Sequence, residues 1–147
     1  MKMINVIAVL LTIASCGYTA TEPPPYIISA PYTDITGNLY NYNYAGIRFD
    51  FFNRSGKTVR QITASFMLFD SKTGTNPFYG SNVFEIAWSE KIMQSEKREV
   101  ILSLDMYLHA VPAEPYLIDF FYISEIQYTD GSTWKDKYGV YSIRKQK

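Results

Sequence analysis

The alternation of apolar and polar residues constrains the fold of this chain more than any other feature. Ile47, Phe49 and Phe51 alternate with Arg48 and Asp50, and the same period of two returns in several later segments. Successive side chains of a β-strand point to opposite faces, so this period is typical of a strand with one buried face. No segment shows a sustained helical period, and the sequence therefore predicts a domain built from β-strands.

Turn-forming residues divide the chain after residue 25 into six or seven such segments. Thr129-Asp130-Gly131-Ser132 is the clearest turn, and we expect a hairpin of the primed kind in which Gly131 has a positive φ. The polar segment 89–97 leaves a short helical turn open as an alternative to a loop. Strands are expected at residues 47–52, 58–70, 83–88, 98–105, 116–128 and 133–143.

Short strands separated by regularly spaced turns are typical of an antiparallel β-sandwich. We expect an all-β fold, an antiparallel immunoglobulin-like sandwich of about seven strands, over residues 26–147. The chain has 147 residues, of which 47% are apolar and 19% charged, and this is ordinary globular composition. A domain of this size buries a sufficient core without a metal or a disulfide.

The first sixteen residues differ from the rest. Lys2 precedes an apolar stretch at 4–13, which has the length of a signal-peptide core and about half of the ~20 residues that a membrane-spanning helix needs. Ile13-Ala14-Ser15-Cys16 then resembles the lipobox of bacterial lipoproteins, an aliphatic residue and two small residues before a cysteine. The resemblance implies cleavage before Cys16 and a diacylglyceryl group on its thiol. A conventional signal peptide, cut after Ala20, is the alternative.

The lipobox resemblance implies a protein of the bacterial cell envelope that is held on a membrane by lipid on Cys16. Residues 1–15 would be the signal peptide, 16–25 the lipidated cysteine with a flexible tether, and 26–147 the folded domain. Three consecutive prolines favour an extended tether, which spans up to roughly 28 Å at about 3.1 Å per residue. Cys16 is the only cysteine, so no disulfide forms within the chain.

Two further segments resemble small immunoglobulin-like domains of bacterial envelope proteins. Residues 52–59 read Phe-Asn-Arg-Ser-Gly-Lys-Thr-Val, similar to the N-x-S/G-K-T-I turn that joins two early strands in those domains. Residues 126–134 are similar to their last hairpin. The resemblance implies an architecture alone, because a fold does not determine a function.

Few side chains are suited to catalysis. His109 is the only histidine, and zinc usually needs three or four His or Cys ligands. Carboxylates acting in pairs, as in glycoside hydrolysis, are the remaining option, but no spacing singles out a pair. We therefore expect no enzyme activity, no metal and no cofactor. The candidate carboxylates are Glu114, Asp119, Glu125, Asp130 and Asp136.

Tyr40, Tyr42 and Tyr44 form the candidate ligand surface. In an extended strand these three rings share one face, and tyrosine offers a large contact area at low entropic cost. The alternative is that they pack over an edge of the sandwich. The 14 basic and 14 acidic residues cancel, so no nucleic-acid partner is expected.

We expect a cell-envelope lipoprotein with a non-catalytic binding or structural domain, whose partners are the membrane, through lipid on Cys16, and a protein or glycan. An accessory subunit of an envelope complex and a small carboxylate-based hydrolase are the alternatives. A broad exposed aromatic patch would favour binding. A concave pocket lined by two or more carboxylates would favour hydrolysis.

Overall fold

The computed structural model describes residues 22–38, 41–108 and 112–145. Within these ranges the chain forms strands and no helix, which confirms the all-β prediction. The strands are β1 (Tyr26–Ile28), β2 (Tyr32–Asn38), β3 (Asn41–Asn53), β4 (Val59–Phe69), β5 (Val83–Trp88), β6 (Lys97–Ser103), β7 (Leu117–Tyr128) and β8 (Thr133–Lys135).

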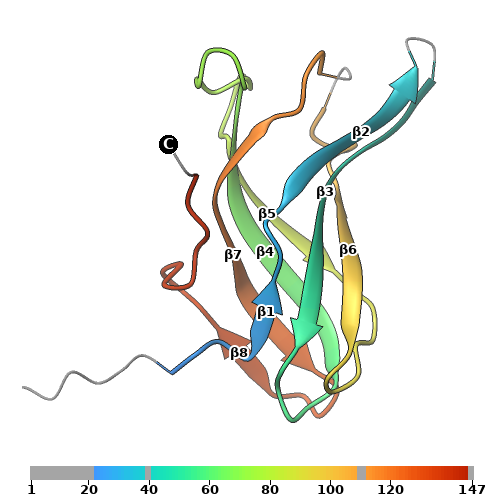
Figure 1. Ribbon diagram of the computed structural model, residues 1–147, viewed down its shortest axis with the longest axis vertical. Helices are drawn as coiled ribbons and strands as arrows, with labels where there is room; N and C mark the ends of the chain where they lie inside the picture. Colours follow the sequence, from blue (N-terminus) through green and yellow to red (C-terminus); the bar gives the residue numbers. More distant parts are fainter. Residues whose placement is uncertain (1–21, 39–40, 109–111, 146–147) are drawn as a thin grey trace, which may run out of the picture.

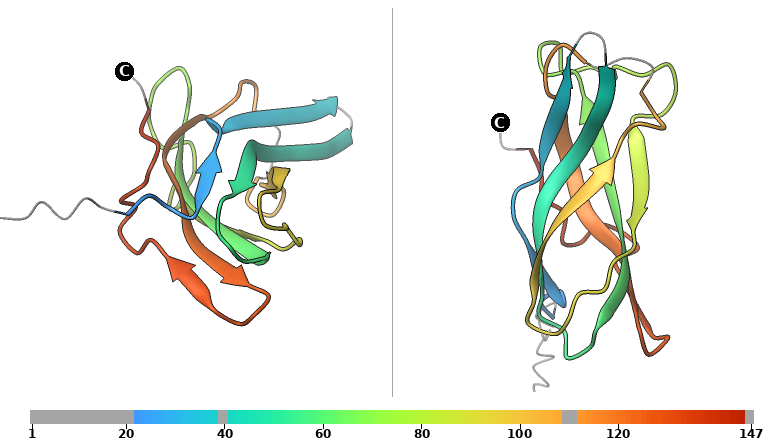
Figure 2. Two further views of the ribbon diagram at one scale, coloured as in Figure 1. Left: turned by 60° about the horizontal axis from the view of Figure 1, so that its bottom comes forward. Right: turned by 90° about the vertical axis from the view of Figure 1, so that its right-hand side faces the viewer.

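The strands form two antiparallel sheets that pack face to face (Figures 1 and 2). In one sheet, β1 and β2 follow each other along one edge of β3, and β6 pairs with the other edge. In the second sheet the order is β5, β4, β7, β8. With the first strands, β3 and β6 opposite a sheet centred on β4 and β7, the described strands form an antiparallel β-sandwich. The predicted fold class is confirmed.

The core is made by alternate residues of the central strands, as the period of two predicts. One ring contact joins the two sheets, since Phe49 of β3 lies 4.9 Å from Phe121 of β7, measured between ring centroids. The row of rings continues within the second sheet, where Phe121 lies 5.7 Å from Phe66 and Phe66 lies 5.7 Å from Phe84. The largest fully buried side chains are Phe49, Phe51, Phe66, Phe121, Ile47, Ile62, Leu68, Ile92, Leu102, Leu104, Ile123 and Ile126.

Aromatic contacts also join the first described strand to the last. The Tyr26 ring is stacked on Phe51, with centroids 5.7 Å apart, and meets Trp134 edge to face at 5.5 Å. Tyr26 is buried, and burial raises the pKa of its phenol. β1 and β8 therefore close the same part of the core.

Asn53, at the end of β3, is a fully buried polar residue that organises the turn into β4. Its amide nitrogen donates to the carbonyls of Lys57 at 2.8 Å, Ile92 at 3.2 Å and Met93 at 3.0 Å. Its side-chain oxygen accepts the backbone N–H of Ser55 at 3.0 Å. One side chain thus ties the β3–β4 turn to the loop between β5 and β6.

The loop at residues 89–96 contains no helical turn, so that alternative is wrong. Ile92 instead forms an isolated antiparallel bridge with Val59 and is fully buried. A residue that pairs with β4 and offers its carbonyl to Asn53 cannot also close a helical turn.

The predicted last strand, residues 133–143, is wrong in its second half, since β8 ends at Lys135. The Asp136 carboxylate accepts the backbone N–H groups of Tyr138, Val140 and Tyr141 at 3.3, 2.9 and 3.0 Å. These bonds fold residues 136–142 into a loop. The chain returns to β7 only at Ile143, which exchanges two backbone hydrogen bonds with Phe121.

The closing hairpin between β7 and β8 has a three-residue loop, where a two-residue primed turn was expected. The N–H of Gly131 donates to the Tyr128 carbonyl at 3.1 Å, and the N–H of Tyr128 donates to the Ser132 carbonyl at 2.9 Å. Among described non-glycine residues only Ser95 and Phe120 have a positive φ, so Asp130 does not. Gly131 has φ 84°, which confirms its predicted positive φ and fits a turn followed by a left-handed residue.

Replacing Gly131 by Val is expected to lower the melting temperature by a few degrees. A β-branched residue in the left-handed region costs about 1–2 kcal/mol, and each kcal/mol corresponds to roughly 4 °C in a domain of this size. Asp130→Asn is the control, because an amide oxygen can still accept from the N–H of Ser132. Thermal melts followed by circular dichroism compare the two. An equal loss in both variants would show that the Asp130–Lys57 ion pair, and not the backbone, controls this turn.

Candidate functional site

The structure places only part of the predicted ligand surface. Tyr42 and Tyr44 lie in β3, where Tyr44 pairs with Thr36 of β2, whereas Tyr40 lies outside the described residues. The pairing of β3 with β6 ends at Gly46, so the segment of β3 that contains the two tyrosines continues beyond β6 in a hairpin with β2 (Figure 1). Cys16 and His109 also lie outside the described residues.

The two ends of the sandwich differ in their exposed side chains. At one end, β1 begins with Tyr26 opposite Asn53, and this is where residues 22–25 join the domain (Figure 1). The hairpin of β2 and β3 and the loops after β4 and β6 lie at the opposite end, which we call the distal end. Its described loop residues, 70–82 and 104–108, include Tyr79, which is fully exposed, Met106, which is 92% exposed, and Tyr107, which is 44% exposed.

Contacts with the core and between loops hold the distal loops in place. The Tyr107 and Phe78 rings both meet Phe84 edge to face, with centroids 5.2 and 5.1 Å away. Lys72 forms an ion pair of 2.8 Å with Glu114, which joins the loop after β4 to the segment before β7. Tyr79 and Met106 are therefore displayed next to anchored neighbours, which lowers the entropy lost on binding a partner.

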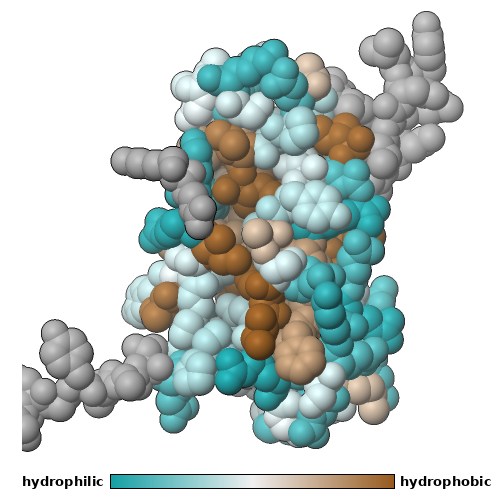
Figure 3. All heavy atoms as spheres, in the orientation of Figure 1, coloured by the Kyte–Doolittle hydropathy of each residue, from teal (hydrophilic) through white to brown (hydrophobic). Residues whose placement is uncertain are grey.

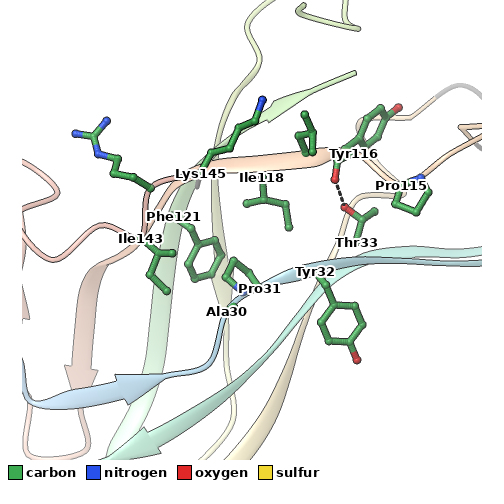
Figure 4. Close-up of a pocket in the computed structure, with 12 residues that line it drawn as sticks. Ala30, Pro31, Tyr32, Thr33, Pro115, Tyr116, Ile118, Phe121, Ile143 and Lys145 are labelled. Atoms are coloured by element: carbon green, nitrogen blue, oxygen red, sulfur yellow. Dashed lines mark hydrogen bonds between the residues drawn. The ribbon is translucent and has the colours of Figure 1, made fainter. Parts of the chain in front are cut away.

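A groove of about 610 Å³ lies on one side of the sandwich, between β2 and the beginning of β7. Figure 3 shows hydrophobic side chains gathered on this face, and Figure 4 shows the groove with the residues that line it. Ile118, Phe121 and Ile143 point toward Pro31 across the groove, whereas the Tyr32 ring lies on the other side of β2 (Figure 4). The Thr33 hydroxyl donates to the Tyr116 carbonyl at 3.1 Å and joins the two walls.

Two basic residues stand at the rim of this groove, Arg144 and Lys145. The Arg144 guanidinium lies 3.9 Å from the centroid of the Phe120 ring, a cation–π contact that holds it in place. Asp119 lies beside them, and its carboxylate accepts the backbone N–H of Lys145 at 2.8 Å. That hydrogen bond is the largest effect that lowers the pKa of Asp119, which therefore stays ionised at neutral pH.

A second hollow, of about 420 Å³, is lined by three carboxylates, Glu85, Glu125 and Asp136. Each carboxylate has partners: Glu125 binds Lys135 at 2.8 Å, Glu85 accepts from the Ser124 hydroxyl at 3.1 Å, and Asp136 holds its loop. The bond to Lys135 is the main cause that lowers the pKa of Glu125. Hydrolysis by a carboxylate pair needs one carboxyl with a raised pKa beside an ionised one, and the lowered pKa of Glu125 suits it only for the ionised role.

The other candidate carboxylates are spread over the surface. Glu114 pairs with Lys72 at the distal end, and Asp130 pairs with Lys57 at 2.9 Å in the closing hairpin. The bond to Lys57 is the first of the causes that lower the pKa of Asp130. In the described part of the chain, no three His, Cys, Asp or Glu side chains lie together in a way that could hold a metal ion.

Sequence reasoning missed both the groove and the exposed distal residues. Phe78 and Tyr79 carried a signal, because they are an aromatic pair inside the otherwise polar loop 70–82, whereas Met106 and Tyr107 have apolar neighbours in the sequence and did not stand out. The groove carried none, since its walls come from residues 30–33, 115–121 and 143–145, which only the fold brings together.

Over the described ranges, the structure contains no helix with the length and hydropathy needed to cross a membrane. The chain was compared with protein-family models, with curated proteins and with solved structures, and none of the three comparisons gave a match.

Proposed function

We propose that this protein is a lipoprotein of the bacterial cell envelope, anchored through Cys16, that binds a partner protein or glycan with the distal end of its sandwich. The observation that carries this proposal is the position of Tyr79, Met106 and Tyr107, which lie at the end opposite the point where residues 22–25 join the domain. A lipid anchor at Cys16 would leave these side chains facing away from the membrane. The proposed role is non-catalytic.

Contacts at the other end support this orientation. The Tyr141 hydroxyl donates to the carbonyl of Glu22, and the N–H of Arg54 donates to the carbonyl of Pro25 at 3.1 Å. Both bonds fix the segment before β1 against the body of the domain. The tether predicted at residues 16–25 therefore leads to a defined end of the sandwich, and the distal end is the part held farthest from the anchor.

Replacing Cys16 by Ser is expected to release the protein from membranes or to leave its signal peptide uncleaved, because the lipid is attached to the thiol. Ser15→Ala is the matched control, since another small residue preserves the lipobox, and it should remain anchored. Membrane fractionation and intact-mass analysis of the parent protein measure both effects. A mature parent chain that begins at Thr21 without lipid would contradict the anchor.

Photo-crosslinking tests the distal end as a binding surface. A photoreactive phenylalanine analogue placed at position 79 or 107 in living cells is expected to give discrete adducts with one partner. The same analogue at position 138 is the control, because Tyr138 is 75% exposed but lies in the loop after β8. Mass spectrometry of the adducts identifies the partner. Adducts at position 138 alone would place the binding surface elsewhere.

A further inference from the structure

The groove between β2 and β7 has an unpaired strand edge along one wall. β2 pairs with β3 on one side, and no other described strand pairs with its outer edge. Alternate residues of an edge strand direct their N–H and C=O groups away from the neighbouring strand, where they can pair with an added strand. Pro31 and Thr33, at the start of this edge, both line the groove.

β7 forms the opposite wall, and other segments of the described chain pair with only part of its edge that faces the groove. β8 pairs with Glu125, Ile126 and Gln127 of β7, and the returning chain makes a single bridge farther along, between Ile143 and Phe121. The first residues of β7, from Leu117, pair with β4 on one side and face the groove on the other. A groove therefore remains along this edge between the two sheets, and the hydrogen bond from Thr33 to Tyr116 crosses it.

The side chains inside the groove are suited to an extended chain with apolar residues at every second position. Ile118 and Ile143, which are partly exposed, form the apolar wall beside the fully buried Phe121, and Pro31 lies across from them (Figure 4). A strand that pairs with the outer edge of β2 directs alternate side chains toward these residues and the others toward solvent. Main-chain hydrogen bonds would supply affinity, and the apolar positions would supply specificity.

The positive charge at the rim of the groove favours a partner segment that carries a negative charge. Arg144 and Lys145 line the groove, and no acidic residue is among its described lining residues. Asp119 offsets one of these two positive charges, so a net positive charge remains at this end of the groove. Arg144 is positioned by the Phe120 ring, which favours a defined contact with a carboxylate over a diffuse attraction.

From the unpaired edge, the apolar wall and the basic rim, we propose that this groove binds an extended segment of a partner protein by strand addition to β2. The segment carries apolar residues at alternate positions and an acidic residue that meets Arg144 and Lys145. The groove lies along the side of the sandwich, and Tyr79, Met106 and Tyr107 are not among its lining residues, so the two proposals rest on different side chains.

Selection from a phage-displayed library of random twelve-residue peptides against the full chain tests this inference. Enriched peptides should alternate apolar and polar residues and contain Asp or Glu. Synthetic copies should bind the Arg144→Glu, Lys145→Glu double variant at least about tenfold more weakly, a loss typical of a removed charge pair. Lys137→Glu, a single-charge control at an exposed site outside the groove, should bind as the parent does, as should Tyr79→Ser at the distal end. Failure to enrich such peptides, or equal binding to the double variant and the parent, would overturn the proposal.

Backbone methylation of an enriched peptide separates strand addition from simple hydrophobic contact. N-methyl groups on one set of alternate residues remove the N–H groups that face β2 and should abolish binding. The same groups on the other set face away from β2 and should leave binding unchanged. Equal loss from both sets, or from neither, would contradict pairing with the strand edge.

Discussion

Replacing Asn53 by Asp is expected to destabilise the domain at neutral pH by about 3–5 kcal/mol, a large part of the total stability of a domain of this size. The amide nitrogen of Asn53 donates to three backbone carbonyls, and a carboxylate has no proton to give them. The variant places a buried negative charge against three carbonyl oxygens. Urea unfolding of the variant and the parent chain at pH 7 measures the loss.

The loss should depend on pH. Burial and the three carbonyls raise the pKa of the carboxyl introduced at position 53 above its unfolded value of about 3.9. The penalty relative to the parent is therefore smallest below that pH and grows as the pH rises through the folded-state pKa. Asn76→Asp is the control, because Asn76 is exposed and its amide nitrogen donates only one hydrogen bond, to the carbonyl of Gly80 at 2.8 Å. A penalty that is equal at pH 3.5 and pH 7 would contradict this account of the turn.

Replacing Phe66 by Ala is expected to destabilise the domain by about 3–5 kcal/mol, since it removes a fully buried ring and leaves a cavity. Phe66 lies between Phe84 and Phe121, so its loss also removes two ring contacts on the inner face of the sheet that contains β4, β5 and β7. Both neighbouring rings are 5.7 Å away and have contacts of their own, so neither can fill the space without losing them. Thermal or urea unfolding gives the magnitude.

The control for Phe66 is Tyr79→Ala, which removes an aromatic ring that is fully exposed. Its effect on stability should stay within about 0.5 kcal/mol, as for most surface substitutions. A comparable loss in both variants would mean that the distal loop stabilises the domain, and Tyr79 would then be a poor probe of binding.

The strands whose bounds were predicted best are those in which apolar and polar residues alternate along the strand itself. The strand at 83–88 has the predicted bounds, the one expected at 116–128 begins one residue later, and the one expected at 58–70 is one residue shorter at each end. Each of these strands has an apolar face of its own. The strand expected at 133–143 failed for a different reason. The alternation of apolar and polar residues continues past Lys135. The Asp136 carboxylate, however, accepts hydrogen bonds from three backbone N–H groups, and these bonds fold the chain away from the sheet.

The sites were less predictable than the strands. The turn at residues 52–59 was singled out by resemblance, yet nothing near Asn53 in the sequence indicates that its amide binds the carbonyls of Ile92 and Met93. The groove depends on how far apart the edges of two sheets lie, which is a property of the assembled sandwich. Local patterns specify faces of strands, and they do not specify the spaces between sheets.

The contact of Tyr26 with Trp134 has a consequence for the order in which the protein is made. Tyr26 is in the first described strand and Trp134 in the last, so a growing chain cannot bring the two rings together until residue 134 has been synthesised. The central sheet pairs are also distant in sequence: Phe52 pairs with Lys97, and Val59 with Tyr128. Forming such pairings costs the entropy of closing long loops. Folding is therefore slow, on the order of milliseconds to seconds. The contact between Tyr26 and Trp134 is therefore among the last parts of the core that a growing chain can complete.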